Sequence, residues 1–349
     1  MSLMKSRFFG KKSIRLPFAL AVFCIFWVLI LNNLQSSCSA SETSDLSAEA
    51  MNAYRTKNYD DAVACFDKLI KLGDTNAYFG RGMALNQKHE YDKAIEDLNE
   101  SIRQRPLFAI AFEVRGDAYS GKNDHIKAVS DYSKAIKINP EMGAAYLARA
   151  EQYIYLKQLD TALIDLHTAI LLLSGSTNAN NLLHNAFFEL ATIYFGRGEY
   201  NQALVYYNNC IEQGTKLSIS YLNRGYIYLW KEEYKKAISD YNEAILLNAN
   251  DADGYNHLGW LLATCPDITH RDGQKALDCA RKACDITEWK ESVCLETYAA
   301  AEAEIGNFTE SVKWENKAIE LGLKDKKLTL AQERLELYKQ HKPYHEAAK

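Results

Sequence analysis

The sequence has few of the residues that interrupt regular structure. Its 349 residues include only 5 prolines and 17 glycines. A many-turned β-sheet protein, a collagen-like chain and a proline- and glycine-rich disordered chain all need more of both, so these classes are excluded. Alanine, leucine, glutamate, lysine and tyrosine are plentiful instead, and we expect an all-α protein.

The sequence also lacks the short motifs of common enzyme classes. It has no G-x-S-x-G, no H-E-x-x-H, no phosphate loop and no G-x-G-x-x-G. His341 and His345 lie four residues apart, but Pro343 between them argues against a metal pair on one helical face. We therefore expect no catalysis, no metal site and no cofactor.

Cysteine pairs with C-x-x-C spacing are absent too. Six cysteines follow residue 40, and the last four are close in sequence: Cys265, Cys279, Cys284 and Cys294. Small buried thiols in a helical core are the favoured interpretation. If the chain is exported, one disulfide among these four stays open.

The first forty residues contain no acidic residue. The basic residues among them are Lys5, Arg7, Lys11, Lys12 and Arg15. An apolar run from Phe18 to Leu31 and a small-residue stretch over 36–40 follow, an order typical of an export signal. A cleaved signal, an uncleaved anchor over residues 16–34 and a lipid-modified Cys38 all stay open. Each alternative places the remainder in the periplasm or otherwise outside the cytoplasmic membrane, and membrane contact is expected only through this segment.

The net charge of the remainder is acidic. The full chain carries −4, and removal of the five basic residues above leaves −4 − 5 = −9. Binding of nucleic acid through a basic surface is therefore not expected.

Three segments repeat one pattern of aromatic, Arg-Gly, Ala-(Ile/Val) and Asp. They are YFGRGMALNQKHEYDKAIEDL, FEVRGDAYSGKNDHIKAVSDY and YLNRGYIYLWKEEYKKAISDY, and the first two start 34 residues apart. Eight units can be placed by the small residue near the start of each second helix: Ala62, Ala94, Ala128, Ala162, Ala203, Ala237, Ala276 and Ser311. Because a helix pair cannot bury its apolar faces alone, the units must stack.

Small residues also recur in the first helix of each unit, namely Ala50, Gly82, Gly116, Ala150, Ala191, Gly225, Gly259 and Ala299. We expect each to meet the small residue of its second helix, so that the two backbones approach closely. This pattern of small and aromatic residues in a 34-residue frame resembles the tetratricopeptide repeat over most of residues 43–325. The resemblance implies a right-handed superhelical solenoid of about eight helix-turn-helix units.

The predicted domains follow from this register. Residues 43–176 hold units one to four, residues 177–183 are an inserted loop, and residues 184–325 hold units five to eight. A second insertion lengthens the turn of unit seven between Cys265 and Gly273. The C-terminal part resembles that of exported bacterial tetratricopeptide proteins, which implies a capping helix at about Lys327 to Gln340 within a final segment over 326–349.

Four units carry an arginine before the small residue of the first helix and an aspartate sixteen residues later. We predict a salt bridge between the two helices of each unit. The pairs are Arg81 with Asp97, Arg115 with Asp131, Arg149 with Asp165 and Arg224 with Asp240.

The resemblance further implies that first helices line an inner groove that holds a peptide or a partner helix. Positions outside the core register are the candidate lining. In the later units these are Phe188, Thr192, Phe195, Asn223, Tyr226, Trp230, Asn256 and Trp260. Five of them are aromatic and are expected to face one trough, where the asparagines could hold a peptide backbone. In the earlier units Glu113, Asp117 and Glu151 suggest a partner with basic character.

Two functions follow from these observations. The first is a non-catalytic scaffold of the cell envelope that binds a polypeptide in the groove. The alternative is an assembly subunit that self-associates or spaces other subunits without a free-peptide groove. The sequence does not name the partner.

Overall fold

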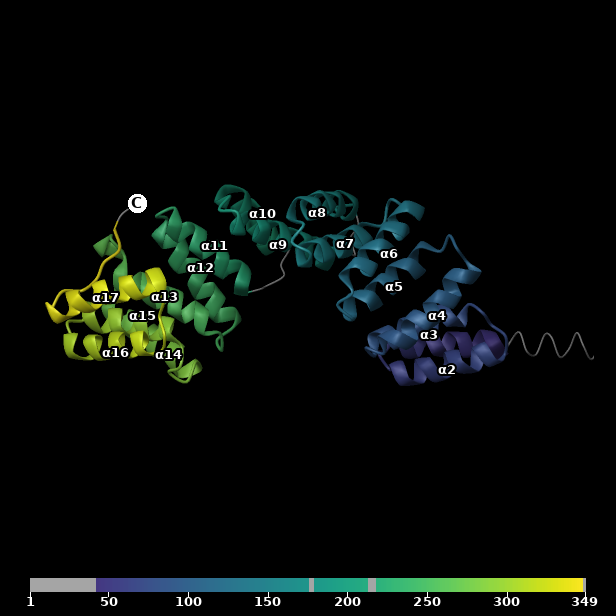
Figure 1. Cartoon of the computed structure of the whole chain (residues 1–349), viewed down its shortest axis with the longest axis horizontal. Coiled ribbons are helices and arrows are strands. Elements are labelled where there is room, and N and C mark those ends of the chain that lie inside the picture. The colour runs from purple at the N-terminus through teal and green to yellow at the C-terminus, as the bar shows by residue number, and fades with distance from the viewer. Residues whose placement is uncertain (1–41, 176–178, 213–217, 348–349) are drawn as a thin grey trace, which may run out of the picture. The chain divides into compact units, whose positions relative to one another are not determined.

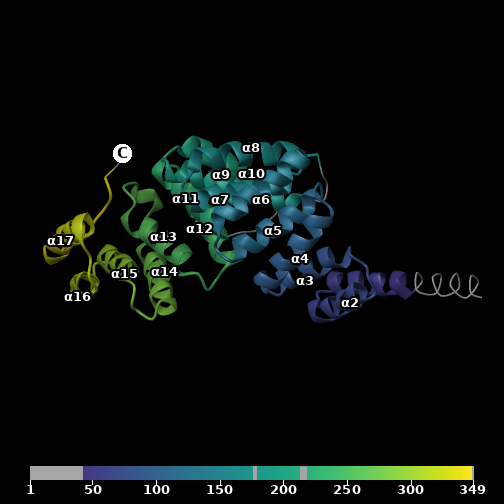
Figure 2. The ribbon, with the colours of Figure 1, turned by 45° about the vertical axis from the view of Figure 1, so that its right-hand side comes forward.

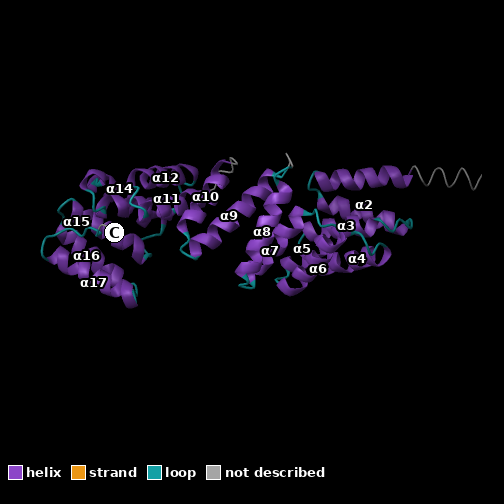
Figure 3. Ribbon diagram, turned by 90° about the horizontal axis from the view of Figure 1, so that it is seen from above, coloured by secondary structure: helices purple, strands orange, loops and turns teal. Residues whose placement is uncertain are grey.

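A computed structural model describes residues 42–175, 179–212 and 218–347. The described residues form helices and turns and contain no strand (Figure 3). The predicted export segment over residues 1–40 lies outside them. Within the described ranges, no helix combines the length and apolarity that crossing a membrane requires. The chain divides into two compact units, residues 1–140 and 141–349.

The first unit holds three antiparallel helix pairs (Figure 1). Its first helix is described over residues 42–55. The others are α2 (Tyr59–Lys71), α3 (Ala77–Gln87), α4 (Tyr91–Gln104), α5 (Ala109–Gly121) and α6 (His125–Ile138). Each helix contacts the next along the chain, and α3 also contacts α5, so that first helices of successive repeats lie side by side.

The second unit holds five further pairs and a final single helix (Figure 2). The pairs are α7 (Gly143–Tyr155) with α8 (Leu159–Leu173), α9 (Asn180–Gly196) with α10 (Tyr200–Glu212), α11 (Ser218–Trp230) with α12 (Tyr234–Leu247), α13 (Ala252–Thr264) with α14 (Gly273–Ile286), and α15 (Ser292–Glu304) with α16 (Phe308–Glu320). The single helix is α17 (Asp325–Lys339). All-α stacking of helix pairs is therefore the architecture of both units.

The turn inside most pairs ends the first helix in the same way. In the second pair, the amide of His89 donates to the carbonyl of Asn86 and the amide of Glu90 donates to that of Leu85, both at 2.9 Å. These two bonds close a Schellman motif, whose central residue adopts positive φ. Glycine occupies that position at Gly198 and Gly306. The other residues there have φ near +60°, and they are Lys57, His89, Asn123, Lys157 and Glu232.

The small residues of the repeat are buried as predicted, but their closest neighbours differ from the expectation. Ala128, like the equivalent alanines, is fully buried. A Cβ added to Gly116 would lie 2.7 Å from the ring of Tyr132, and one on Gly225 would lie 2.7 Å from that of Tyr241. A large side chain one turn beyond the alanine therefore fills the space that the glycine leaves. In two other units the small residues meet as expected: a Cβ added to Gly82 would lie 3.4 Å from the carbonyl oxygen of Ala94, and one on Gly259 would lie 3.2 Å from that of Ala276.

The inserted loop predicted over 177–183 is wrong in its extent. Helix α9 begins at Asn180, so the second half of that segment is helical. Leu183 is buried there, and its burial stabilises an extra helical turn despite the two asparagines before it. The insertion in unit seven contains a short 3₁₀ helix, Ile268–His270, and Arg271 from this turn pairs with Glu304 of α15 at 3.1 Å.

Helix α17 lies where the sequence places the capping helix. Ala331, Leu335 and Tyr338 of α17 are buried. Tyr338 belongs to the same apolar cluster as Ala299 and Ala303 of α15. The last repeat therefore does not expose its apolar face.

Candidate functional site

Each of the four predicted arginine–aspartate pairs forms. In every case Nε and Nη2 of the guanidinium donate to the two carboxylate oxygens, over 2.6–2.8 Å. The aspartates are at most 5% exposed, so these are buried bidentate pairs and not surface contacts. Such a bidentate guanidinium–carboxylate pair fixes the angle as well as the distance between two helices.

Three of these arginines also bond to a side chain of the preceding repeat. Nη1 of Arg115 donates to Oδ1 of Asn99 at 2.6 Å, and Nη1 of Arg224 donates to Oδ1 of Asn208 at 2.8 Å. Arg81 makes the corresponding contact with Asp67 on α2. One guanidinium therefore joins the second helices of two successive repeats. These partners were missed from the sequence, although a polar residue 14 or 16 positions before the arginine was the available signal.

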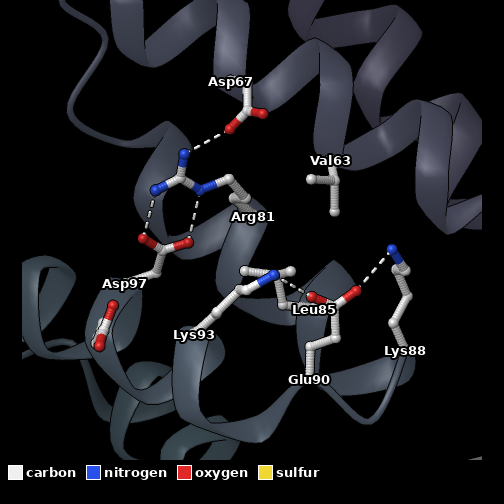
Figure 4. Close-up of a pocket in the computed structure, with 9 residues that line it drawn as sticks. Val63, Asp67, Arg81, Leu85, Lys88, Glu90, Lys93 and Asp97 are labelled. Carbon is white, nitrogen blue, oxygen red and sulfur yellow. Dashed lines mark hydrogen bonds and ion pairs between the residues drawn. The ribbon is translucent and has the colours of Figure 1, made fainter.

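A cavity of about 390 Å³ lies among α2, α3 and α4, and charged side chains line it (Figure 4). Arg81 pairs there with Asp67 and Asp97, and Glu90 pairs with Lys88 and Lys93, each at 2.7 Å. The lining holds three basic and four acidic residues, a net charge of 3 − 4 = −1, and most of these charges are paired with one another.

Two of the three acidic candidates lie one turn apart on α5. Burial, followed by the nearby charge of Asp117, raises the pKa of Glu113 to about 7. Burial also raises the pKa of Asp117, whose carboxylate accepts a hydrogen bond from Tyr132 at 2.8 Å. A cationic group beside this pair would relieve the repulsion between the carboxylates. Glu151, the third candidate, lies on α7 in the second unit.

Four aromatic side chains gather in the second unit around a cavity of about 320 Å³. The ring of Phe195 lies 5.7 Å from Tyr200 and 5.5 Å from Tyr226, and Tyr200 lies 4.7 Å from Trp230. Tyr226 and Trp230 are 39% and 46% exposed. The cavity is lined by Phe195, Tyr200, Ile219, Leu222, Asn223, Tyr226, Asp253 and His257. We call Phe195, Tyr200, Tyr226 and Trp230 the aromatic cluster.

Three other candidates are positioned around Tyr207. The amide of Asn223 donates to the Tyr207 hydroxyl at 2.9 Å, and Thr192 also hydrogen-bonds that hydroxyl. The ring of Phe188 packs edge-on against Tyr207 at 6.3 Å. Because Tyr207 is fully buried, its hydroxyl needs these partners. One N–H of the Asn223 amide is thus engaged within the protein, and the expected role of Asn223 in holding a peptide backbone stays a prediction.

The single trough expected for five aromatic residues stays a prediction. Trp260 makes its described ring contact with Tyr344 and not with the aromatic cluster. The chain's own C-terminal residues cover Trp260, since its indole donates to Glu346 at 2.8 Å. A second cavity of about 230 Å³ adjoins Trp260 and Asn256. His257 lines this cavity as well as the one beside the aromatic cluster. Burial lowers the pKa of His257, whose ring stacks on Tyr241 at 5.5 Å.

The described cysteines are all buried and free of disulfides. Burial raises the pKa of Cys210 and of Cys284 to about 12, so neither thiol ionises readily. No group of three or more metal-ligating side chains that could hold a metal occurs among the described residues.

Comparison with known proteins identifies the repeats. Tetratricopeptide repeat models match residues 47–107, 111–142, 185–213 and 218–251. No curated protein matches the chain.

Solved structures share the fold at low sequence identity. The C-terminal part of a repeat-containing protein from Cytophaga hutchinsonii is 16% identical with a TM-score of 0.54, over 72% of this chain and 98% of that one. A chain of the Cut9–Hcn1 hetero-tetramer of APC/C is 15% identical with a TM-score of 0.50, over 79% of this chain. This chain covers 52% of that one, about half its length. A tetratricopeptide repeat protein from Parabacteroides merdae is 14% identical with a TM-score of 0.47, over 86% of this chain and 99% of that one.

The presence of these repeats supports a role as a protein–protein interaction scaffold. The helix pairs, the buried small residues and the family matches agree: the chain is a tetratricopeptide repeat protein.

Proposed function

We propose that this protein is a non-catalytic scaffold that binds a polypeptide partner across α9, α11 and α13, with the aromatic cluster as its main contact. The observation that carries the proposal is the exposure of Tyr226 and Trp230 beside a cavity. Exposed aromatic side chains that lie together provide large contact area and are enriched at the energetic centres of interfaces.

The shape and polarity of this surface favour an apolar side chain inserted into the cavity. Leu222 and Ile219 line it together with the rings, while Asp253 provides a carboxylate at its edge. Asp253 is exposed, and His257 beside it is neutral at physiological pH because burial lowers its pKa. An apolar or aromatic residue with a lysine or arginine nearby would therefore complement the site.

Selection of peptides from a random library on the full chain in detergent tests this proposal. Selected peptides should contain an apolar residue near a basic one. The variant Tyr226→Ala with Trp230→Ala should weaken their binding at least about 30-fold, because loss of an interface centre of this kind removes roughly 2 kcal/mol or more.

A matched control removes apolar surface from second helices instead. Val205 on α10 and Leu246 on α12 are exposed, and Val205→Ala with Leu246→Ala should leave peptide binding within about twofold of wild type. Equal losses in both double variants, or no loss in the first, would contradict the proposal. Asp253→Asn should reduce the preference for a basic residue without abolishing binding.

We further propose that the scaffold works in the cell envelope. The support is the order of basic residues, apolar run and small residues in the first forty positions. Alkaline phosphatase, which is active only outside the cytoplasm, should be active when fused after Lys349. An inactive but stable fusion would refute this location.

A further inference from the structure

The residues after α17 form an extended segment that docks onto other helices of the second unit. Pro343 to Ala347 are not helical, and in Figures 1 and 2 the chain runs back from α17 toward α13. The amide of Glu346 donates to the carbonyl of Thr264 at 2.8 Å. Thr264 is the last residue of α13, where helical carbonyls have no partner within the helix.

Each of three consecutive side chains in this segment contacts a residue of another helix. The carboxylate of Glu346 accepts from the indole of Trp260 at 2.8 Å. The imidazole of His345 contacts the carboxylate of Glu304 at 2.7 Å. We call Tyr344–Glu346 the tail motif.

Tyr344 completes the motif by packing on Trp260 and Arg334. Its ring lies 6.2 Å from that of Trp260, and the guanidinium of Arg334 lies 5.9 Å from it. The same guanidinium lies 5.3 Å from the Trp260 ring. Arg334 is held rigidly, because it pairs with Glu296 and Glu315 in the core.

The tail motif packs on the edge of the core, since Tyr344 lies against the apolar cluster of Ala299, Ala303 and Tyr338. Its residues are only partly buried, whereas Tyr338 in α17 is fully buried. Its single recorded backbone bond to another helix and its side-chain contacts are those of an extended peptide. Trp260 and Arg334, which contact Tyr344, also line the cavity of about 230 Å³, where Oδ1 of Asn256 is buried without a partner in the described residues.

We infer that Trp260, Thr264, Glu304 and Arg334 form a second peptide site whose resident ligand is the chain's own tail motif. A partner binds there by replacing the motif with an extended segment of the same chemistry: an aromatic residue, then a histidine or cation, then a carboxylate. The inference extends the proposed function to a separate subsite.

A labelled peptide of residues 342–349, KPYHEAAK, tests the inference without knowledge of the partner. The full chain with Tyr344→Ala and Glu346→Ala has an open site and should bind this peptide. Wild type should bind it at least about tenfold more weakly, since a tethered ligand acts at an effective concentration near millimolar. A peptide with the same two alanines should not bind the open variant.

Trp260→Phe in the open variant separates the two contacts of the indole. It keeps the ring but removes the donor to Glu346, so peptide affinity should fall several-fold. Equal binding to wild type and the open variant overturns the inference, and so does failure of the open variant to bind. An open variant that no longer folds, by circular dichroism, also overturns it, because the tail would then belong to the core. The peptide used here is independent of the library peptides, so this result does not depend on the aromatic cluster.

Discussion

Removal of one buried aspartate should loosen a repeat far more than removal of an exposed one. Asp131 on α6 accepts two hydrogen bonds from Arg115 at 2.6 and 2.8 Å, and the two side chains are 3% and 14% exposed. Asp92 on α4 pairs with Lys122, and these side chains are 79% and 40% exposed. Asp131→Ala and Asp92→Ala therefore make the same chemical change in two environments of the same unit.

The expected magnitude follows from what each change leaves behind. Breaking a fully buried pair by removing one partner costs about 3–5 kcal/mol, since an uncompensated charge remains. Arg115 retains some solvent contact and its bond to Asn99, which lowers our expectation for Asp131→Ala to about 2–3 kcal/mol. An exposed pair contributes about 0–1 kcal/mol, so Asp92→Ala should lie at that lower level.

Hydrogen exchange measured on peptides from α5 and α6 suits this comparison better than a single unfolding curve. Stacked repeats open locally, and a global midpoint would average over the units. A loss of about 2–3 kcal/mol corresponds to a roughly 30- to 150-fold drop in protection of these helices. Arg115→Met with Asp131→Leu should recover most of it, because an apolar pair leaves no buried charge. Equal exchange in Asp131→Ala and Asp92→Ala would refute the reasoning.

Three further predictions concern titration and packing. Because the pKa of Glu113 is raised to about 7, the stabilising contribution of its protonated form is complete below about pH 4.5 and is lost as the pH rises through about 7. Glu113→Gln should remove this pH dependence from melting temperatures measured between pH 5 and pH 8. Burial raises the pKa of Glu315 to about 7, although Glu315 pairs with Arg334, and the second glutamate on that arginine, Glu296, raises it as well. Glu315→Gln should therefore leave the melting temperature at pH 8 unchanged or higher. Gly116→Ala should destabilise by about 1–3 kcal/mol through overlap with a tyrosine ring, whereas Gly196→Ala, with open space around it, should be neutral or stabilising in urea unfolding.

The repeat register could be predicted because it depends on local spacing. Ala94 and Ala128 occupy equivalent positions 34 residues apart, and helix pairing then fixes which side chains meet. The arginine–aspartate pairs followed from this register, since a separation of sixteen residues spans one turn between two antiparallel helices. Both followed from comparing the repeats within this one sequence.

The features that could not be predicted depend on contacts between distant segments. Trp260 and Glu346 lie 86 residues apart, and no periodicity relates a tail to a helix. The role of Asn223 was also hidden, because its partner Tyr207 belongs to another helix pair and became visible only when the repeats were stacked. Tyr200 was missed for a related reason: it begins a second helix, whereas the candidates were sought on first helices.

The two kinds of position in the repeat explain how one fold can hold both a fixed register and a binding surface. Asp240 and Tyr241 face α11 and are buried, so substitutions there change the packing of the pair. Tyr226 and Trp230 lie on α11 as well, but they contact Phe195 and Tyr200 of the preceding repeat and remain 39% and 46% exposed. Binding specificity can therefore change from repeat to repeat while the buried pairs keep each helix in place.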